Sequence, residues 1–371
     1  IMAESKKNFD EVFEDVTKHG TKIKTDEYHS QGKYQIIDQG QEAIAGYTDL
    51  EDGVFKSVPA IVFGDHTRIV KYVDKPFFLG ADGVKVLRSR FTDANYRYLY
   101  YALKNVKIPD TGYNRHFKWL KESQISYPSA ERQSQIVSIL DGISSIIGCY
   151  EQQLQKLDEL VKARFVEMFG DSEFNTMQWP TKKLSELCNV GSSKRIYQNE
   201  QCAEGIPFLR ISDLNERIDN VENAPELFIP TEKYNELKET DLVPTAGDIL
   251  VTSRGTLGRC YIVRQEDEFY FQDGMISWLS DLNNQITSVY LSQLFAMSGI
   301  QKQIASLQAG STVAYLSISM LKKLNIMLPP LDRQKQFSAF VEQTDKSKVA
   351  IQKALDKAQL LFDSLMQQYF G

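Results

Sequence analysis

Apolar residues recur with the period of a coiled coil in two long stretches of the chain. In the first stretch they advance by alternating steps of four and three residues from Ile136 to Val161. A mean step of about 3.5 residues is typical of the seam along which two helices pack. The second stretch keeps this register from Phe337 onward, except where Thr344 and Lys348 interrupt it. The predicted seam residues are Ile136, Leu140, Ile143, Ile147, Leu154, Leu157, Phe337, Val341, Ile351, Leu355 and Phe362.

The two stretches are copies of one segment. Adding 201 to residues 128–170 places them on residues 329–371 without a gap, and nine of the 43 aligned pairs are identical. Roughly two or three identities would be expected from average composition. Proline begins both copies and glycine ends both, as is common at helix boundaries. Each globular stretch is therefore followed by one long helix, which predicts a pseudo-twofold repeat.

The two predicted helices are expected to pack against each other in antiparallel orientation. Forty helical residues reach about 60 Å. Parallel packing would require the chain to return that distance after Gly170, whereas antiparallel packing requires no return. We therefore expect a rigid rod within one chain, with one globular head at each end. A coiled coil that joins separate chains is the alternative.

Both heads are predicted to be mixed α/β, with the same order of elements. In each head, four strand-like runs are followed by a helix and a polar loop. An Asp-Gly pair recurs before the last strand, as Asp82-Gly83 and Asp273-Gly274. The predicted fold class is therefore α+β, with two mixed α/β heads separated by two long antiparallel helices. The strand-like runs are 34–37, 59–63, 68–73 and 84–87, then 207–211, 248–252, 260–263 and 275–279, and the helices lie near 95–105 and 289–307.

Length and composition indicate a soluble globular protein of at least two domains. A chain of 371 residues exceeds the usual size of a single core. No apolar run approaches the ~20 residues that cross a bilayer, and the charged N-terminal stretch lacks the apolar core of a signal peptide. The four cysteines are scattered without a CxxC pair. This usage suits a reducing cytosol and argues against zinc fingers or a disulfide framework.

The net charge of −6 does not indicate a nucleic-acid partner, but the charge is unevenly distributed. Residues 84–121 contain nine basic and two acidic side chains, a balance of +7, whereas residues 213–241 are predominantly acidic. A basic stretch of this kind can attract a phosphate backbone. A solvated face without a partner is the alternative for either stretch.

Sequence motifs for catalysis are missing. The single Pro-Pro pair, Pro329-Pro330, is followed by Leu331 and does not form the Asp/Asn-Pro-Pro-aromatic motif of adenine methyltransferases. The chain contains neither a GxxxxGK[ST] phosphate loop nor an HExxH zinc motif, and its four histidines are dispersed. We therefore expect no catalytic residues and no metal site.

Polar loops in both heads have side chains that can bind the edges of DNA bases. Arg and Lys can donate to guanine O6 and N7, and Gln or Asn can pair with adenine. Basic side chains beside these loops can bind phosphates. Ordinary turns rich in Gly, Ser and Asn are the alternative. The candidate DNA-binding residues are Gln39, Gln41, His66, Thr67, Arg68, Asn114, Arg115, His116 and Lys118 in the first head, and Ser193, Lys194, Arg195, Arg210, Ser253, Arg254, Thr256, Ser311 and Thr312 in the second.

Seven runs of sequence form a recognisable set, namely KYQIIDQGQ (33–41), IAGY (44–47), PAIVFGDHTR (59–68), FFLGADGVKVL (77–87), GIPFLRISDL (205–214), GDILVTSRGTLG (247–258) and LPPLDRQ (328–334). These runs resemble the target-recognition domains and the helix entry of type I restriction-modification specificity subunits. The resemblance covers nearly the whole chain and includes the order head, helix, head, helix. The sequence at the start of the first helix, YPSAERQ (127–133), departs from the fuller LPPLDRQ form of the second.

The resemblance implies two target-recognition domains, at 1–128 and 171–329, and two helices, at 129–170 and 330–371. It implies a non-catalytic subunit that reads a split double-stranded DNA target, one half-site per head, with a gap set by the helices. The helices would dock methyltransferase subunits that use S-adenosylmethionine, while this chain would bind no cofactor. Restriction/translocase subunits would join the complex, which would act on DNA in the cytoplasm of a bacterium or archaeon.

Two other functions remain open from the residues alone. The acidic balance and the predicted coiled coil also suit an adaptor whose heads bind proteins. Phosphate contacts would make affinity fall steeply with salt, which separates the two functions. The third possibility is an enzyme with an unrecognised nuclease site in one head, for which a metal-dependent cleavage assay is the test.

Overall fold

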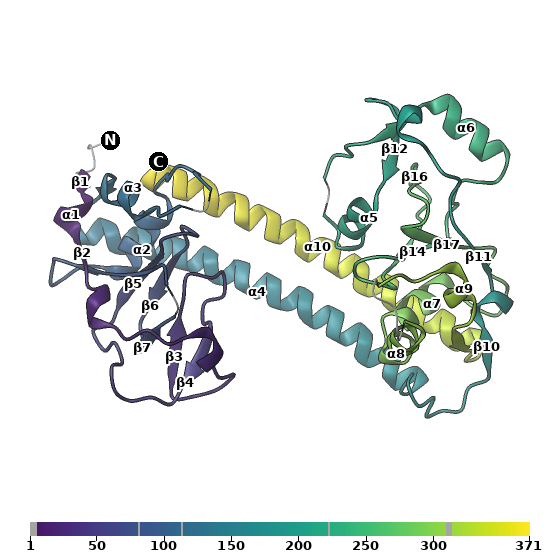
Figure 1. The fold of residues 1–371 in the computed structure, drawn as a ribbon, viewed down its shortest axis with the longest axis horizontal. Coiled ribbons are helices and arrows are strands. Elements are labelled where there is room, and N and C mark those ends of the chain that lie inside the picture. The colour runs from purple at the N-terminus through teal and green to yellow at the C-terminus, as the bar shows by residue number, and fades with distance from the viewer. Residues whose placement is uncertain (1–5, 81, 113, 222, 309–313) are drawn as a thin grey trace. The chain divides into compact units, whose positions relative to one another are not determined.

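The computed structural model describes residues 6–80, 82–112, 114–221, 223–308 and 314–371. The chain divides into two compact units, of which unit 1 comprises residues 1–151 and 352–371 and unit 2 comprises residues 152–351. Both units take part of each long helix, α4 (Ala130–Phe169) and α10 (Leu331–Phe370) (Figure 1). The first head is the part of unit 1 before α4, and the second head is the part of unit 2 between α4 and α10.

The first head contains three small sheets. A four-stranded antiparallel sheet has the order β2-β8-β5-β6, and a three-stranded sheet has the order β4-β3-β7 with β3 and β7 parallel. A short antiparallel pair, β1 with β9, precedes α4 in the chain. The strands are β1 (Lys6–Asn8), β2 (Phe13–Asp15), β3 (Tyr34–Ile37), β4 (Gly46–Thr48), β5 (Ala60–Gly64), β6 (Val70–Val73), β7 (Phe77–Leu79), β8 (Val84–Ser89) and β9 (Gln124–Ser126). The helices are α1 (Phe9–Val12), α2 (Tyr96–Lys104) and α3 (Phe117–Lys121), with 3-10 turns at Thr17–His19 and Thr25–Glu27.

The second head repeats this topology strand for strand. Its sheets have the orders β11-β17-β14-β15 and β13-β12-β16, with β12 and β16 parallel, and β10 pairs with β18. The strands are β10 (Thr181–Lys183), β11 (Asn189–Gly191), β12 (Ile206–Leu209), β13 (Phe228–Ile229), β14 (Ile249–Thr252), β15 (Cys260–Ile262), β16 (Tyr270–Phe271), β17 (Ile276–Ser280) and β18 (Asn325–Met327). The helices are α5 (Ile211–Ile218), α6 (Thr231–Glu239), α7 (Ser288–Phe295), α8 (Ser298–Leu307) and α9 (Ile318–Lys322), with 3-10 turns at Leu184–Glu186 and Gln198–Glu200.

The main difference between the heads is a pair of added helices. Helix α5 lies between β12 and β13, and α6 lies between β13 and β14, where the first head has only loops and bends. The predicted helix near 289–307 is two helices, α7 and α8, with a break at Ala296-Met297. These additions explain why the two heads cannot be aligned at the fixed offset that relates the long helices.

The two long helices are antiparallel, as the sequence predicted. In unit 1, the Arg132 guanidinium near the start of α4 lies 5.5 Å from the ring of Tyr369 near the end of α10. In unit 2, the relation is reversed, because Phe165 and Phe169 near the end of α4 pack on Phe337 near the start of α10, with ring centroids 5.5 and 5.4 Å apart. The α+β prediction with a pseudo-twofold repeat is confirmed.

Seam residues are more buried near the heads than in the middle of the long helices. The predicted seam residues nearest the heads are buried, namely Ile136, Leu140, Phe337, Val341 and Phe362. Those in the middle of the helices are half-buried, because two helices alone cannot enclose a seam; they are Ile143, Ile147, Leu154, Leu157, Ile351 and Leu355.

The two polar interruptions of the seam both have partners. Thr344 is buried, and its hydroxyl donates to the carbonyl of Phe340 one turn earlier, at 2.9 Å. The Lys348 ammonium lies 2.7 Å from the Asp158 carboxylate on α4. Polar residues therefore fit this seam without leaving a buried group unsatisfied. Among the helices that the structure describes, none combines the length and apolar character needed to cross a membrane.

Candidate nucleic-acid interface

Four loops of the first head meet at one edge of its sheets. Strands β3 and β7 are parallel, so the loops that follow them leave the same edge. Strand β5 ends beside the start of β8, since Gly64 pairs with Val84. This arrangement brings together the loop 38–45, the β5–β6 hairpin 64–69 and the β7–β8 turn, and the segment 110–116 packs against them.

Gln39 braces these loops with its own amide. Its Nε2 donates to the carbonyl of Asp82 at 3.0 Å, and its Oε1 accepts from the backbone N–H of His66 at 3.1 Å. The Thr67 hydroxyl donates to the Gln39 carbonyl at 2.6 Å. Gly83 has a φ of +90°, and a Cβ there would lie 2.6 Å from Gln39 Nε2, so only glycine fits this turn. Gln39 is therefore a scaffold of the edge, although the sequence predicted a base contact.

A buried lysine holds the loop that carries Gln39 and Gln41. The Lys71 ammonium on β6 donates to the carbonyl of Glu42 at 2.6 Å and to the Asp38 carboxylate at 3.2 Å. The Lys71 side chain is 7% exposed. Because a buried ammonium is costly without acceptors, this lysine ties the start (Asp38) and the middle (Glu42) of the loop to β6. Gln41 stays exposed at its tip.

The β5–β6 hairpin is tied to the segment that precedes α3. The His66 ring Nδ1 lies 3.2 Å from the Asn114 carbonyl, and Arg68 forms an ion pair with Asp110 at 2.8 Å. The Gly112 N–H, followed by the Arg68 guanidinium, lowers the pKa of the Asp110 carboxyl. Thr67 and Asn114 are exposed, and Arg115 is exposed on the same segment.

His116 is buried, so its predicted DNA contact would require the side chain to leave the core of the head. Its side chain is 1% exposed, and its Nδ1 lies 3.1 Å from the carbonyl of Asp65. The buried Asp65 carboxylate accepts from the Phe117 N–H at 2.8 Å, which fixes the start of α3. Lys118, two residues after His116, is exposed with its ammonium 4.0 Å from the centre of the Trp119 ring.

The second head forms the equivalent edge, where Ser253 takes the place of Asp65. Ser253 is 1% exposed, and its hydroxyl lies 2.7 Å from that of Ser277. The predicted DNA contact of Ser253 would require this buried hydroxyl to leave its partner. Arg254 is exposed, and its guanidinium lies 5.3 Å from the centre of the Tyr315 ring. Thr256 is exposed in the same hairpin.

The loop after β11 carries the remaining predicted residues of this edge. Lys194 is exposed, and its backbone N–H donates to the Tyr270 hydroxyl at 2.8 Å. Arg195 donates from Nε to the Asp273 carboxylate at 2.9 Å. The Ser193 hydroxyl is buried, and within the described part of the chain it makes no hydrogen bond. Ser311 and Thr312 lie outside the described residues.

The Arg210 side chain forms ion pairs beside α5, one of the added helices of the second head. Its guanidinium pairs with Asp213 at 3.3 Å and with Glu226 at 2.7 Å, at the start of α5. Together with the bond from the Arg210 N–H to the Asp213 carboxylate at 2.8 Å, these ion pairs anchor the start of α5, which is a sufficient structural reason for the arginine. The predicted DNA contact would require Arg210 to leave both carboxylates.

One ion pair at the first edge was not predicted. The Lys22 ammonium lies 2.6 Å from the Asp82 carboxylate, and Lys22 lowers the pKa of that carboxyl. Lys22 lies in a stretch without a recognisable motif, so the sequence offered no signal for it other than its charge.

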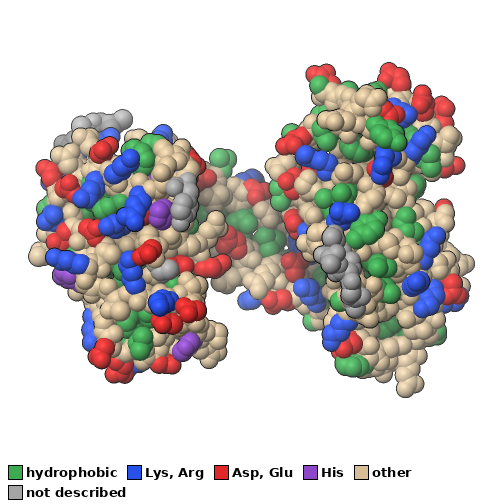
Figure 2. All heavy atoms as spheres, viewed as in Figure 1, with side chains coloured by type: hydrophobic (Ala, Val, Ile, Leu, Met, Phe, Trp, Pro, Cys, Tyr) green, Lys and Arg blue, Asp and Glu red, His purple; other side chains and the backbone are tan. Residues whose placement is uncertain are grey.

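Much of the basic stretch 84–121 stabilises the first head instead of forming a free surface. Lys85 pairs with Asp15 at 2.9 Å, Arg90 donates to the carbonyl of Asp10 at 2.8 Å, and Arg97 pairs with Asp141 on α4. Figure 2 accordingly shows basic and acidic side chains interspersed on the viewed face of each unit. Other basic side chains of the stretch stay exposed, namely Arg115 beside the β5–β6 hairpin, Lys107 in the loop after α2, and Lys104, Lys118 and Lys121 on α2 and α3.

Both heads are joined to the long helices by the same contacts. The Tyr98 hydroxyl donates to the carbonyl of Ser126 at 3.0 Å, and the Tyr290 hydroxyl donates to that of Met327 at 3.1 Å. Burial raises the pKa of Tyr290. Gln133 Nε2 donates to the Pro128 carbonyl at 3.0 Å, and Gln334 repeats this bond to Pro329 at 2.9 Å. The twofold repeat therefore extends from the helices into the base of each head.

Comparison with known proteins gives one consistent family. The pattern of the type I restriction modification DNA specificity domain matches residues 5–159 and 177–360. A Haemophilus influenzae protein assigned provisionally as a type I restriction enzyme specificity subunit is 28% identical over 262 residues, which cover 67% of this chain and 64% of that protein. The MjaVIII specificity subunit of Methanocaldococcus jannaschii is 25% identical over 293 residues, covering 70% of this chain and 67% of its own.

A solved structure has a similar fold. The S subunit of a type I restriction-modification system from M. genitalium superposes with a TM-score of 0.61 at 19% identity, covering 99% of this chain and 96% of that one. Because the family pattern covers both repeats, this chain belongs to the type I restriction-modification DNA specificity family.

Proposed function

We propose that this chain is the DNA-recognition subunit of a type I restriction-modification complex. The observation that carries the proposal is the repeated edge. The loops that follow β5 and β7 meet in the first head, those that follow the equivalent strands β14 and β16 meet in the second, and each edge displays exposed polar or basic side chains, among them Asn114, Arg115, Lys194 and Arg254. Such side chains have the hydrogen-bonding chemistry that base edges require.

The two edges differ in sequence within a common frame, as expected of two readers with different targets. We propose that each head reads one half-site of a bipartite target. The antiparallel helices α4 and α10 would set the unread gap, because a helix has a fixed rise of about 1.5 Å per residue.

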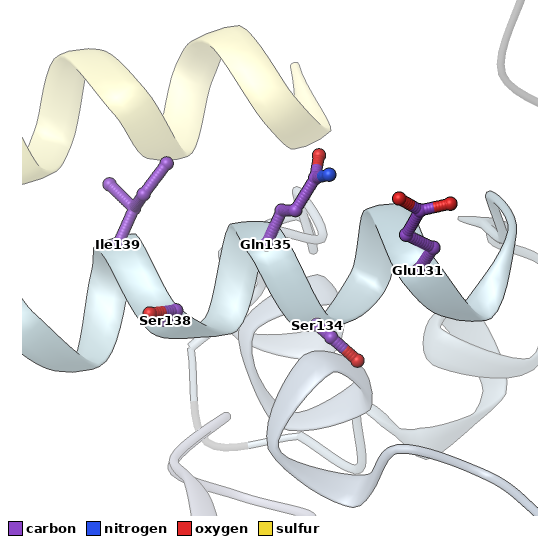
Figure 3. Close-up of a pocket in the computed structure, with 5 residues that line it drawn as sticks. All are labelled: Glu131, Ser134, Gln135, Ser138 and Ile139. Atoms are coloured by element: carbon purple, nitrogen blue, oxygen red, sulfur yellow. The ribbon is translucent and has the colours of Figure 1, made fainter.

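The helix pair also offers a surface on which partner subunits can dock. In unit 1, apolar side chains are exposed on both helices, namely Ile139, Ile146, Leu360 and Leu361. A shallow depression on α4 includes Ile139, which with Gln135 points toward α10 (Figure 3). Exposed apolar groups of this kind favour protein contacts. We propose that methyltransferase subunits bind there.

The chemistry would belong to the partners. The methyltransferase subunits would use S-adenosylmethionine to methylate adenine in the target, and restriction/translocase subunits would cleave unmodified DNA. This chain would bind no cofactor and supply no catalytic group. The complex would act on DNA in the cytoplasm of a bacterium or archaeon.

Mapping methylated adenines across the genome tests the proposal. The chain is expressed with its partner methyltransferase in cells that lack other adenine methylation, and the methylated sites are aligned. We expect one bipartite target with two fixed half-sites and a constant gap. A chimera that exchanges the first head for that of a relative should change one half-site only. An unchanged target in the chimera, or methylation without sequence preference, would contradict the proposal.

A further inference from the structure

One ion pair recurs at equivalent places in the two heads. In the first head Lys22 pairs with Asp82 at 2.6 Å, and in the second head Arg195 pairs with Asp273 at 2.9 Å. Both carboxylates belong to an Asp-Gly turn between equivalent strands, β7 and β8 or β16 and β17. The glycines of both turns have left-handed φ angles, +90° at Gly83 and +69° at Gly274.

The basic partners occupy equivalent positions as well, although no fixed offset relates them. Ile23, which follows Lys22, is buried beside Ile36 and Phe78 of the parallel strand pair β3/β7. Ile196, which follows Arg195, is buried beside Phe208 and Tyr270 of the equivalent pair β12/β16. A buried isoleucine therefore precedes the equivalent parallel strand pair in each head. The residue directly before this isoleucine is the basic one, Lys22 or Arg195.

Different loop lengths hide this equivalence in the sequence. Six residues (16–21) separate β2 from Lys22, whereas three (192–194) separate β11 from Arg195. The two heads therefore have a basic side chain at the same structural position, although the loops that lead to it differ in length. An exposed ion pair adds little to stability, so folding alone gives no reason for its repetition.

Each pair leaves donors available to a ligand. Arg195 bonds Asp273 through Nε, and its two terminal nitrogens make no hydrogen bond within the described part of the chain. Lys22 bonds Asp82 with its ammonium, which has three N–H donors. The Lys22 and Arg195 side chains are 48% and 63% exposed. A carboxylate that binds a basic side chain from one side restricts its rotamers and directs the remaining donors outward.

We propose that Lys22 and Arg195 are equivalent base-reading residues, one in each head, and that Asp82 and Asp273 are positioning residues that orient them. The proposal rests on the proposed function. The acceptors that match both side chains are guanine O6 and N7, which Arg or Lys can bind in the major groove. Each half-site should therefore contain a guanine that is read by Lys22 in the first head or by Arg195 in the second.

The test measures DNA affinity of the full chain assembled with its methyltransferase, at one fixed salt concentration. The probes are duplexes that carry the mapped target and duplexes in which each base pair of a half-site is replaced in turn. The specificity ratio is the affinity for the target divided by the affinity for a replaced duplex. Lys22→Ala should lower this ratio about tenfold at a single G·C pair of the first half-site and leave the second half-site unchanged. Arg195→Ala should do the reverse.

The positioning role has its own readout. Asp82→Asn and Asp273→Asn remove a negative charge, so affinity for any DNA should rise, yet the specificity ratio should fall at the same base pair as in the basic variant. Lys22→Arg should keep most of the ratio. Lys24→Ala and Lys238→Ala, at exposed lysines outside the pairs, are the controls.

Three results would contradict the inference. If Lys22→Ala and Arg195→Ala weaken all duplexes equally, the side chains bind phosphates and do not read bases. If Asp82→Asn and Asp273→Asn leave the ratio unchanged, the carboxylates do not position their partners. If the basic variants bind as the wild type does, neither residue contacts DNA. A wild-type complex without preference for either half-site would instead contradict the proposed function itself.

Discussion

The ring of Tyr98 lies 5.3 Å from the ring of Phe370, so the last turn of α10 belongs to the core beneath the first head. The equivalent pair in unit 2 is Tyr290 and Phe169, with ring centroids 4.9 Å apart at the end of α4. Each head is therefore completed by the helix that follows the other head in the sequence. A chain organised in this way needs both copies of the helix for either head to be fully packed.

Loss of an aromatic ring at this junction should destabilise the adjoining unit. Phe169 is fully buried, so Phe169→Ala should lower the free energy of unfolding of unit 2 by about 3–5 kcal/mol. Phe370→Ala should lower the free energy of unfolding of unit 1 by a smaller amount, because Phe370 is only partly buried. Urea unfolding followed by hydrogen exchange measures the effect unit by unit. Phe174→Ala, at a ring that is 73% exposed, is the control, and an equal loss there would refute the explanation.

Removal of the buried lysine under the Gln41 loop should loosen the first edge. Lys71→Met leaves the Asp38 carboxylate and the Glu42 carbonyl without their partner, which should cost about 1–3 kcal/mol of stability. Hydrogen exchange of residues 38–45 should accelerate, and target discrimination should fall in the first half-site alone. Lys75→Met, at an exposed lysine, should have neither effect. Unchanged exchange in the loop would show that Lys71 does not hold it.

Restoration of the apolar seam should make the helix pair more stable. The Lys348–Asp158 pair has an Asp158 side chain that is 61% exposed, so it contributes about 1 kcal/mol at most. Lys348→Ile removes this pair but extends the seam, and the free energy of unfolding should rise by about 1 kcal/mol. Thermal unfolding should also become less sensitive to salt. A marked loss of stability would mean that the ion pair matters more than the seam, and Lys346→Ile, at an exposed lysine, controls for the new side chain.

A buried carboxyl at the start of β14 should make unit 2 sensitive to pH. Burial raises the pKa of Asp248 above its usual value of 3.8, although Thr245 and Trp278 donate to it. A raised folded pKa means that the contribution of Asp248 to stability is complete below pH 3.8 and is lost as pH rises through the folded value. Asp248→Asn keeps an acceptor oxygen without this titration. As pH rises through that window, the wild type should lose stability relative to the variant, so the free energy of unfolding of Asp248→Asn minus that of the wild type should increase. A decrease of this difference would contradict the assignment.

The long helices and the order of the heads were predictable because they depend on local periodicity and on a repeat that aligns without a gap. Ile136 and Phe337 occur at the same register position, and both are buried. Thr344 and Lys348 looked like interruptions because the sequence pattern does not show their partners. Thr344 bonds to the Phe340 carbonyl within the same helix, and Lys348 pairs with Asp158 on the other helix.

The candidate interface was only partly predictable, since a polar residue type does not indicate where its side chain points. His116 and Ser253 lie in polar loops but turn inward, and Gln39 uses its amide to brace neighbouring loops. Lys22, for which we propose a role in base reading, was not predicted, because the loops before Lys22 and Arg195 differ in length and no alignment at a fixed offset pairs the two residues. Only the buried anchors Ile23 and Ile196 reveal that the two positions are equivalent.

The most direct test of the account lengthens the helix pair and reads the target. Insertion of one heptad in α4 after Gln152 and one in α10 after Ile351 keeps the seam in register and adds about 10.5 Å to each helix. At about 3.4 Å per base pair, the gap between the half-sites should grow by about three base pairs. Adenine methylation is mapped for the wild type and the lengthened chain, each expressed with the same methyltransferase. Two unchanged half-sites with a longer gap are the expected result, whereas an unchanged gap or altered half-sites would contradict the role of the helices as the spacer.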